Sequence, residues 1–191
     1  GRQPATASLH PENAGIAVNE RGAIVVDKRL HTTADNIWAM GDVTGGLQFT
    51  YISLDDYRIV RDELLGEGKR STDDRKNVPY SVFMTPPLSR VGMTEEQARE
   101  SGADIQVVTL PVAAIPRARV MNDTRGVLKA IVDNKTQRML GASLLCVDSH
   151  EMINIVKMVM DAGLPYSILR DQIFTHPSMS ESLNDLFSLV K

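Results

Sequence analysis

The feature that most constrains this chain is a short apolar run that ends in a glycine-rich turn. The apolar run covers residues 37–40, residues 41–46 contain three glycines, and residues 49–65 carry apolar side chains at near-helical spacing. This order predicts a strand, a tight turn and a helix, the arrangement with which α/β proteins hold a nucleotide. Glycine tolerates the backbone conformations of a sharp turn and lets a ligand approach the backbone. We therefore expect Gly41 to lie against a ligand.

Asp42 adds a carboxylate to this turn, and two interpretations of it are open. An ionised carboxylate accepts hydrogen bonds and repels phosphate, so a ligand hydroxyl of the sugar type would be its partner. Alternatively, Asp42 only closes the turn or caps a helix, and on residue type alone this second interpretation is favoured.

The helix after the turn should begin close to Phe49 and Thr50, directly after Gln48. The first N–H groups of a helix lack partners within the helix, and its dipole is positive at that end. We expect this helix start to face a ligand atom that carries negative charge.

Charge and hydropathy exclude several classes of function. The 191 residues have a net charge of −3, which favours neither a nucleic-acid partner nor an acidic tail. We find no apolar run long enough to span a bilayer and no signal peptide, so we expect a cytoplasmic protein without a membrane partner.

The chain begins without Met in what reads as a loop, which suggests a fragment. Its single cysteine, Cys146, excludes an intrachain disulfide, so a redox dithiol must come from elsewhere.

A polar stretch divides the chain into two regions. Residues 67–77 contain seven charged side chains and no apolar one, so we place a domain boundary there, between residues 1–76 and 77–191. In the first region, residues 15–19 and 23–27 predict a hairpin beside the strand of residues 36–40.

The second region predicts an α+β fold built on an antiparallel sheet. Thr94 and Gln97 form the pattern of a helix-capping box. Residues 113–123 are expected to be irregular. The predicted strands are residues 82–85, 105–112, 126–132 and 139–146, and the longer predicted helices are residues 149–162 and 178–190.

His176 and Glu181 form the second candidate site. Because Pro177 follows, the backbone at His176 is expected to be extended, which holds the imidazole outside the next helix. Glu181 could then accept a hydrogen bond from one ring nitrogen and leave the other for acid–base work. Ser178 and Glu181 also fit a capping box, and a pair of this kind at a helix start is more often structural, so that role stays open as well. We see no spacing of His and Cys typical of a structural metal site.

Five motifs in order resemble the C-terminal part of the class I pyridine nucleotide-disulfide oxidoreductases, which include glutathione reductase, dihydrolipoamide dehydrogenase and mercuric reductase. Residues 48–56 look closest to a bacterial branch associated with reactive-chlorine resistance. The motifs are Gly1-Arg2-x-Pro4-x-Thr6, Ile37-Trp38-Ala39-x-Gly41-Asp42-Val43, Thr85-Pro86 with Val91-Gly92-Met93-Thr94-Glu95, Leu140-Gly141-Ala142, and His176-Pro177-Ser178-x-x-Glu181.

The resemblance implies specific roles. Residues 1–76 would be the C-terminal portion of an FAD-binding domain, in which Asp42 binds the ribityl chain and the backbone near Thr50 faces the flavin. Residues 77–191 would form a homodimer, with His176 acting in the partner's active site and Glu181 orienting it. It also implies a cis bond between His176 and Pro177.

The family's dithiol and its N-terminal nucleotide-binding glycine motifs are absent from this sequence. We therefore expect the full-length protein to be an FAD-dependent oxidoreductase that takes hydride from NADH or NADPH, whose site is not in this chain. The chain alone is expected to be inactive. Two alternatives stay open: a non-catalytic dimerisation module, and a reductase of metal ions such as copper.

Overall fold

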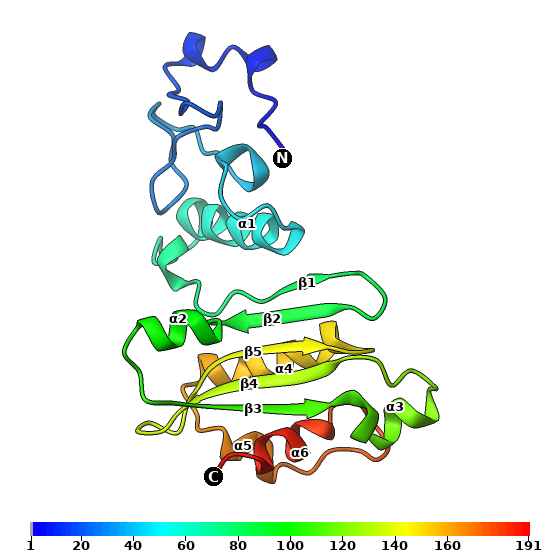
Figure 1. Ribbon diagram of the computed structural model, residues 1–191. Coiled ribbons are helices and arrows are strands. Elements are labelled where there is room, and N and C mark those ends of the chain that lie inside the picture. Colours follow the sequence, from blue (N-terminus) through cyan, green and yellow to red (C-terminus); the bar gives the residue numbers. More distant parts are fainter. Residues whose placement is uncertain (1) are drawn as a thin grey trace. The chain divides into compact units, whose positions relative to one another are not determined.

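The structure is a computed structural model that describes residues 2–191; Gly1, the first residue of the first motif, lies outside the described residues. The chain forms two compact units, of which the first ends at Lys76 and the second begins at Asn77. Both units are visible in Figure 1. No helix of the described part is long and apolar enough to cross a membrane.

The first unit is built around one long helix. Its core consists of small and branched apolar side chains from the loops and from this helix, among them Ala23, Leu30, Ile52 and Ile59. The helices are α1 (Thr50–Leu65) and the short 3₁₀ segments η1 (Ala7–Leu9), η2 (Pro11–Ala14), η3 (Gly41–Thr44) and η4 (Thr72–Asp74). The helix after the glycine turn begins at Thr50, so its prediction is confirmed.

The predicted strands of the first unit are wrong. Residues 15–19 and 23–27 do pair as a minimal hairpin, through the antiparallel bridge between Val18 and Ile24 and two backbone hydrogen bonds, but neither run forms a strand. Residues 36–40 contribute only the bridge between His31 and Trp38. A strand requires a neighbouring strand for its backbone N–H and C=O groups. Among residues 2–76, the apolar run pairs only around Trp38, with two backbone hydrogen bonds to residues 30 and 32, so no sheet forms.

The second unit is a five-stranded antiparallel sheet with the strand order β1-β2-β5-β4-β3. One row of apolar side chains crosses four strands, because Val91 pairs with Ala142, Ala142 with Ala130, and Ala130 with Val108. All four are buried in the core of this unit. The strands are β1 (Tyr80–Val82), β2 (Leu88–Gly92), β3 (Ile105–Pro111), β4 (Val127–Asp133) and β5 (Met139–Leu145).

Helices cover this row. Helix α4 packs on β2 and β5, and α6 packs on β3 and β4 (Figure 1). The α+β class with an antiparallel sheet flanked by helices is therefore confirmed. The helices of this unit are α2 (Glu95–Glu100), α3 (Pro116–Val120), α4 (Ser149–Asp161), α5 (Ser167–Asp171) and α6 (Ser182–Ser188), with the 3₁₀ segment η5 (Val112–Ala114).

Three local expectations for this unit need correction. Residues 113–123 are not irregular, because Pro116 occupies the first turn of α3, a position where its missing N–H costs nothing. Strand β1 ends at Val82, and β2 follows two prolines that concealed it. The last helix begins at Ser182 rather than at residue 178. The capping box of Thr94 and Gln97 is present as predicted.

Among residues 2–191, two peptide bonds before proline are cis. The bond between His176 and Pro177 is one of them, as the family resemblance implies. The bond between Thr85 and Pro86, which we did not predict, is the other.

Candidate functional site

Helix α1 packs against the glycine turn of residues 41–46 and fixes its backbone. Gly41 has a φ of +78°, which favours glycine, and its N–H donates to Oδ2 of Asp56 at 2.7 Å. A Cβ atom added at Gly41 would lie 2.9 Å from Oγ of Ser53, a hydroxyl that can rotate away, so the requirement for glycine comes mainly from the positive φ. The sequence predicted close approach of a ligand here. In the structure, it is helix α1 that lies close to the backbone of Gly41.

Asp56 is the residue that sequence reasoning missed in this unit. It is 2% exposed, and its carboxylate also pairs with the guanidinium of Arg75. Arg75 Nε donates in addition to Oδ2 of Asp55 at 2.8 Å. Burial disfavours the charged form of Arg75, but the hydrogen bonds to the two carboxylates outweigh it and raise its pKa. A signal was present in the sequence, since Ile52, Asp56 and Ile59 follow one helical face, which places a carboxylate among apolar side chains.

Asp42 lies on the exposed side of the same turn. Its side chain is 51% exposed, and Nη1 of Arg2 lies 3.8 Å from its Oδ2. Exposed pairs at this distance contribute little to stability. The Asp42 carboxylate is therefore free to accept hydrogen bonds from a ligand.

Gln48, Phe49 and Thr50 carry the chain from the turn into α1. Phe49 occupies the N-cap position, and its side chain has no oxygen that could accept from the first N–H groups of the helix. Its ring stacks on Tyr51 with centroids 5.0 Å apart. Segment η3, which contains Gly41 and Asp42, packs against α1, so the predicted residues of this unit share one neighbourhood.

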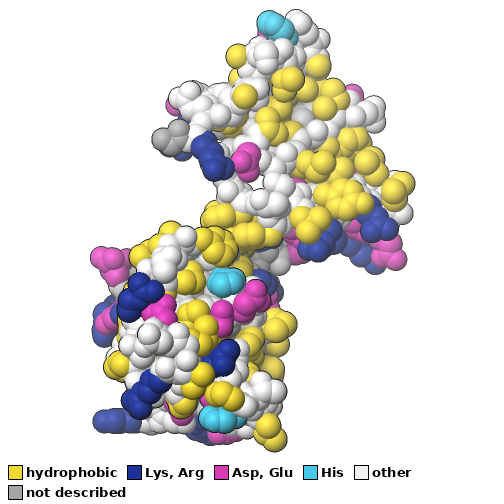
Figure 2. All heavy atoms as spheres, turned by 90° about the vertical axis from the view of Figure 1, so that its right-hand side faces the viewer, with side chains coloured by type: hydrophobic (Ala, Val, Ile, Leu, Met, Phe, Trp, Pro, Cys, Tyr) yellow, Lys and Arg dark blue, Asp and Glu magenta, His cyan; other side chains and the backbone are white. Residues whose placement is uncertain are grey.

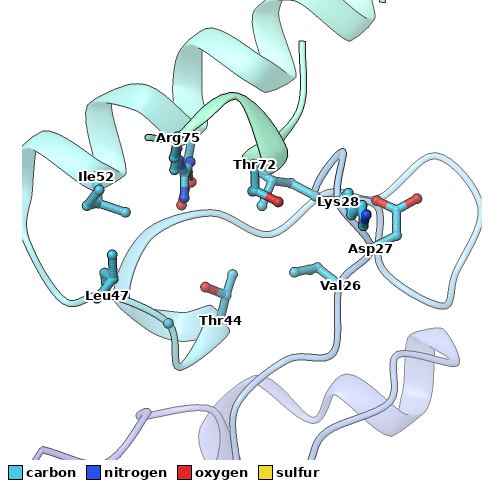
Figure 3. Close-up of a pocket in the computed structure, with 11 residues that line it drawn as sticks. Val26, Asp27, Lys28, Thr44, Leu47, Ile52, Thr72 and Arg75 are labelled. Carbon is cyan, nitrogen blue, oxygen red and sulfur yellow. Dashed lines mark hydrogen bonds and ion pairs between the residues drawn. The ribbon is translucent and has the colours of Figure 1, made fainter. Parts of the chain in front are cut away.

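A hollow of about 360 Å³ adjoins the glycine turn, because Thr44 and Gly46 line it (Figure 3). Leu47 and Ile52 face each other across it, and Val26 points toward Thr44. Asp56 and Arg75 line it as well, whereas Asp42 and residues 48–50 do not contribute to its lining.

His176 and Glu181 lie together in the second unit, as predicted. Nδ1 of His176 lies 2.8 Å from Oε2 and 3.0 Å from Oε1 of Glu181. The His176 side chain is 70% exposed, whereas that of Glu181 is 16% exposed. The carboxylate thus holds Nδ1 in its protonated form and leaves Nε2 toward solvent. Such a ring can accept or deliver a proton at Nε2.

This pairing also explains the late start of α6. The hydroxyl of Ser178 accepts from the N–H of Glu181 at 3.2 Å, which is one half of the capping box. The other half would need the Glu181 carboxylate, but His176 occupies it. Residues 180 and 181 therefore form a turn before the helix begins.

A small hollow of about 240 Å³ accompanies the pair. Pro116 of α3 and Asn184 and Asp185 of α6 line it together with His176 and Glu181. Among residues 2–191, no three side chains of His, Cys, Asp or Glu are arranged to hold a metal ion.

The chain matches two parts of one protein family. Residues 78–187 match the pyridine nucleotide-disulphide oxidoreductase dimerisation domain, and residues 1–56 match the pyridine nucleotide-disulphide oxidoreductase domain. Members of this family use FAD and NAD(P)H.

Curated relatives are oxidoreductases. The chain is 36% identical over 183 residues to the mercuric reductase of Staphylococcus aureus, a match that covers 96% of this chain and 33% of that protein. It is 31% identical to the dihydrolipoyl dehydrogenase of Mycobacterium tuberculosis, which covers 92% of this chain and 38% of that protein. The chain therefore spans about a third of the length of these relatives.

Solved structures show the same fold. The HOCl-induced flavoprotein disulfide reductase RclA of Escherichia coli, solved also as a Cu(II) complex, is 99% identical with a TM-score of 0.99, over 100% of this chain and 44% of that one. LpdA of Mycobacterium tuberculosis is 24% identical with a TM-score of 0.89, over 100% of this chain and 41% of that one. The chain therefore belongs to the pyridine nucleotide-disulphide oxidoreductase family, in the branch that contains RclA.

Proposed function

We propose that this chain is the C-terminal part of an FAD-dependent NAD(P)H oxidoreductase. In this proposal it supplies part of the flavin site, the dimer interface and an acid–base pair, His176 and Glu181, that acts in the partner subunit. The observation that carries the proposal is the hydrogen bonding of Nδ1 of His176 to both oxygens of a shielded carboxylate, with the imidazole exposed. A non-catalytic dimerisation module would not need an imidazole held in this way.

The proposed role of His176 is proton transfer at Nε2. Glu181 fixes the tautomer with the proton on Nδ1, so that Nε2 can take a proton from an attacking thiol. The same nitrogen returns the proton to the leaving thiolate at the end of the exchange. Glu181 keeps its hydrogen bonds to Nδ1 in both events, so the ring stays oriented with Nε2 toward the thiol.

The proposed flavin site consists of Gly41, Asp42 and residues 48–50 of the first unit. Asp42 would accept hydrogen bonds from hydroxyls of the ribityl chain, which suits an exposed carboxylate on a braced turn. The start of α1 would face the flavin ring, where the helix dipole stabilises negative charge. FAD supplies the hydride and electron transfer when bound, and these residues bind and orient it.

We assign residues 1–76 to the FAD-binding domain and residues 77–191 to the dimerisation domain of the longer protein.

Exposed apolar side chains support a homodimer through the second unit. Phe83 is 77% exposed and Ile173, three residues before His176, is 94% exposed. Figure 2 shows hydrophobic side chains on the face that carries the turn between β1 and β2, where Val82, Phe83 and Met84 are exposed. We place the protein in the cytoplasm, where a buried thiol such as Cys146 stays reduced.

A reductase of metal ions is the second candidate, because the structure of the similar RclA protein has been solved as a Cu(II) complex. The two candidates differ in the electron acceptor. Assays of the full-length protein with NADH and NADPH against disulfide, quinone and Cu(II) acceptors distinguish them.

The test of the acid–base role is His176→Gln in the full-length protein. General acid–base catalysis contributes about 10²- to 10⁴-fold, so we expect a loss of turnover in that range with a disulfide acceptor. His10→Gln is the matched control, since His10 lies in an exposed turn and its Nδ1 pairs with Oε1 of the neighbouring Glu12 at 3.2 Å. Turnover of His176→Gln at the wild-type rate would overturn the proposal.

A further inference from the structure

The side-chain amide of Asn184 is bound to three carbonyl groups of one chain segment. Its Nδ2 donates to the carbonyl oxygens of Leu169 at 2.7 Å, Arg170 at 3.0 Å and Gln172 at 3.0 Å. Leu169 and Arg170 belong to α5, and Gln172 is the residue after its end. The last carbonyls of a helix have no partner within the helix. Asn184 therefore closes the C-terminal end of α5.

The segment that leaves α5 is the one that carries His176. Gln172 is extended, with φ −70° and ψ 145°, so the chain turns away from the helix there. Ile173 is exposed to solvent, and Phe174 packs against the core of the unit. The path of the chain to His176 is thus set by the point where Asn184 holds Gln172.

Both ends of this segment are held by one helix. Glu181 directly precedes α6 and binds the imidazole, and Asn184 lies three residues further along, on the same side of the helix. Asn184 and Glu181 line one hollow together with His176. Helix α6 itself packs against the sheet through buried Leu183 and Phe187. Because α6 is packed on the sheet, Asn184 holds the start of residues 172–176 in place and Glu181 holds their end.

We propose that Asn184 is a positioning residue for His176. It acts through the backbone of residues 172–176 and sets where the imidazole stands, while Glu181 sets how the ring is oriented. The inference rests on the proposed acid–base role of His176. Asn184 itself does not contact the reacting atoms.

The chemistry of the contact explains why an amide is needed. An NH₂ group has two hydrogens that three nearby carbonyl oxygens can share. An Asp at this position would place a carboxylate against the same oxygens, and an Ala would leave them without a donor. Either change frees the start of the segment. Misplacement of a catalytic group by about 1 Å can cost about a hundredfold in rate.

The first measurement compares Asn184→Ala with Asn154→Ala in the full-length protein. Asn154 is the matched control, because its amide makes one bond, at 3.0 Å, to the carbonyl of His150 in its own helix. We expect kcat for the reduction of a disulfide acceptor by NADH or NADPH to fall about tenfold to a hundredfold in Asn184→Ala. KM for the pyridine nucleotide should stay unchanged. Asn154→Ala should stay within about twofold of wild type. Asn184→Gln keeps the donor one methylene further out, and it carries the comparison if Asn184→Ala does not fold.

The deciding measurement repeats the substitution on a His176→Gln background. If Asn184 acts through His176, the double variant is no slower than His176→Gln alone, since the effects of residues acting as a unit are not additive. The same fold-loss on both backgrounds, or Asn184→Ala at the wild-type rate, would overturn the inference. An unimpaired His176→Gln variant would instead overturn the acid–base role itself, so the two failures are distinguishable.

Discussion

Nδ1 of His176 donates its hydrogen bond into both carboxylate oxygens of Glu181, at 2.8 and 3.0 Å. Glu181 is largely shielded from solvent, so its negative charge acts on the ring with little screening. The pair can be separated into an orienting part and a charge part.

Glu181→Gln keeps an oxygen that can accept from Nδ1 but removes the charge. We expect turnover of the full-length protein to fall about tenfold in Glu181→Gln and further in Glu181→Ala, which loses both the charge and the acceptor. Steady-state assays measure this series. Glu151→Gln is the control, because Glu151 lies 3.9 Å from His150 on the surface. Equal activities of Glu181→Gln and Glu181→Ala would contradict separate roles for orientation and charge.

Asp42→Ala should weaken the binding of FAD to the full-length protein. A hydrogen bond to a charged group is worth about 1.5–3 kcal/mol, which corresponds to a tenfold to hundredfold change in Kd. Flavin absorbance per protein after dialysis measures the loss, with Asp35→Ala in an exposed turn as control.

We also expect the 191-residue chain alone to bind FAD weakly or not at all. Purification of this chain with one flavin per protein would contradict that expectation.

Gly126→Ala should destabilise the second unit far more than Gly102→Ala. Both glycines have a positive φ, +109° and +76°. A Cβ atom at Gly126 would lie 1.9 Å from the carbonyl oxygen of Leu145, whereas nothing lies within 4 Å of one at Gly102. We expect a loss of about 1 kcal/mol at Gly102 from backbone strain and about 3 kcal/mol or more at Gly126. Chemical denaturation measures both. Equal losses would show that conformation, and not the contact with Leu145, sets the requirement for glycine.

Cys146 should be inert toward thiol reagents in the folded chain. Burial, followed by the charges of Asp148 and Asp123, raises the pKa of its thiol to about 12. The thiolate is the reactive form, and at pH 8 it makes up only about one part in ten thousand. Because this chain has one cysteine, labelling by a disulfide reagent reports Cys146 alone. We expect labelling only after denaturation; fast labelling of the folded chain would contradict the burial.

The stability of the second unit should fall in acid, in part through Glu95. Hydrogen bonds from Lys129 first, and then from Arg99, lower the pKa of Glu95 in the folded state. A carboxyl whose folded pKa is depressed stabilises the fold above its unfolded pKa and loses that contribution as the pH falls through the folded value.

Glu95→Gln should therefore flatten the decline in the free energy of unfolding below about pH 4. Denaturation curves recorded between neutral and acid pH test this. Glu100→Gln, at the other end of α2, should leave the decline as steep as in the wild type. A Glu95→Gln curve parallel to that of the wild type would rule out the contribution.

The sequence predicted the elements whose signals are local. The capping box of Thr94 and Gln97 places the start of α2, because both partners lie within one turn. The strand expected at residues 36–40 failed, because a strand depends on a neighbour that the local pattern does not reveal. The pair of His176 and Glu181 was predictable from its spacing, and Asn184 was not. Its partners lie 12 to 15 residues away and are backbone carbonyls, which leave no mark on the residue types.

The hydrogen bond from Gly41 to Asp56 has a consequence for how the turn meets a ligand. The turn takes its shape from a buried carboxylate and from Arg75, neither of which lies on the exposed side where Asp42 stands. Its geometry is thus preorganised, and a ligand that binds Asp42 loses little free energy to ordering the loop. The affinity of the turn for a ligand then depends on the buried residues that fix its backbone. A substitution at Asp56 would change this affinity although Asp56 itself makes no contact with the ligand.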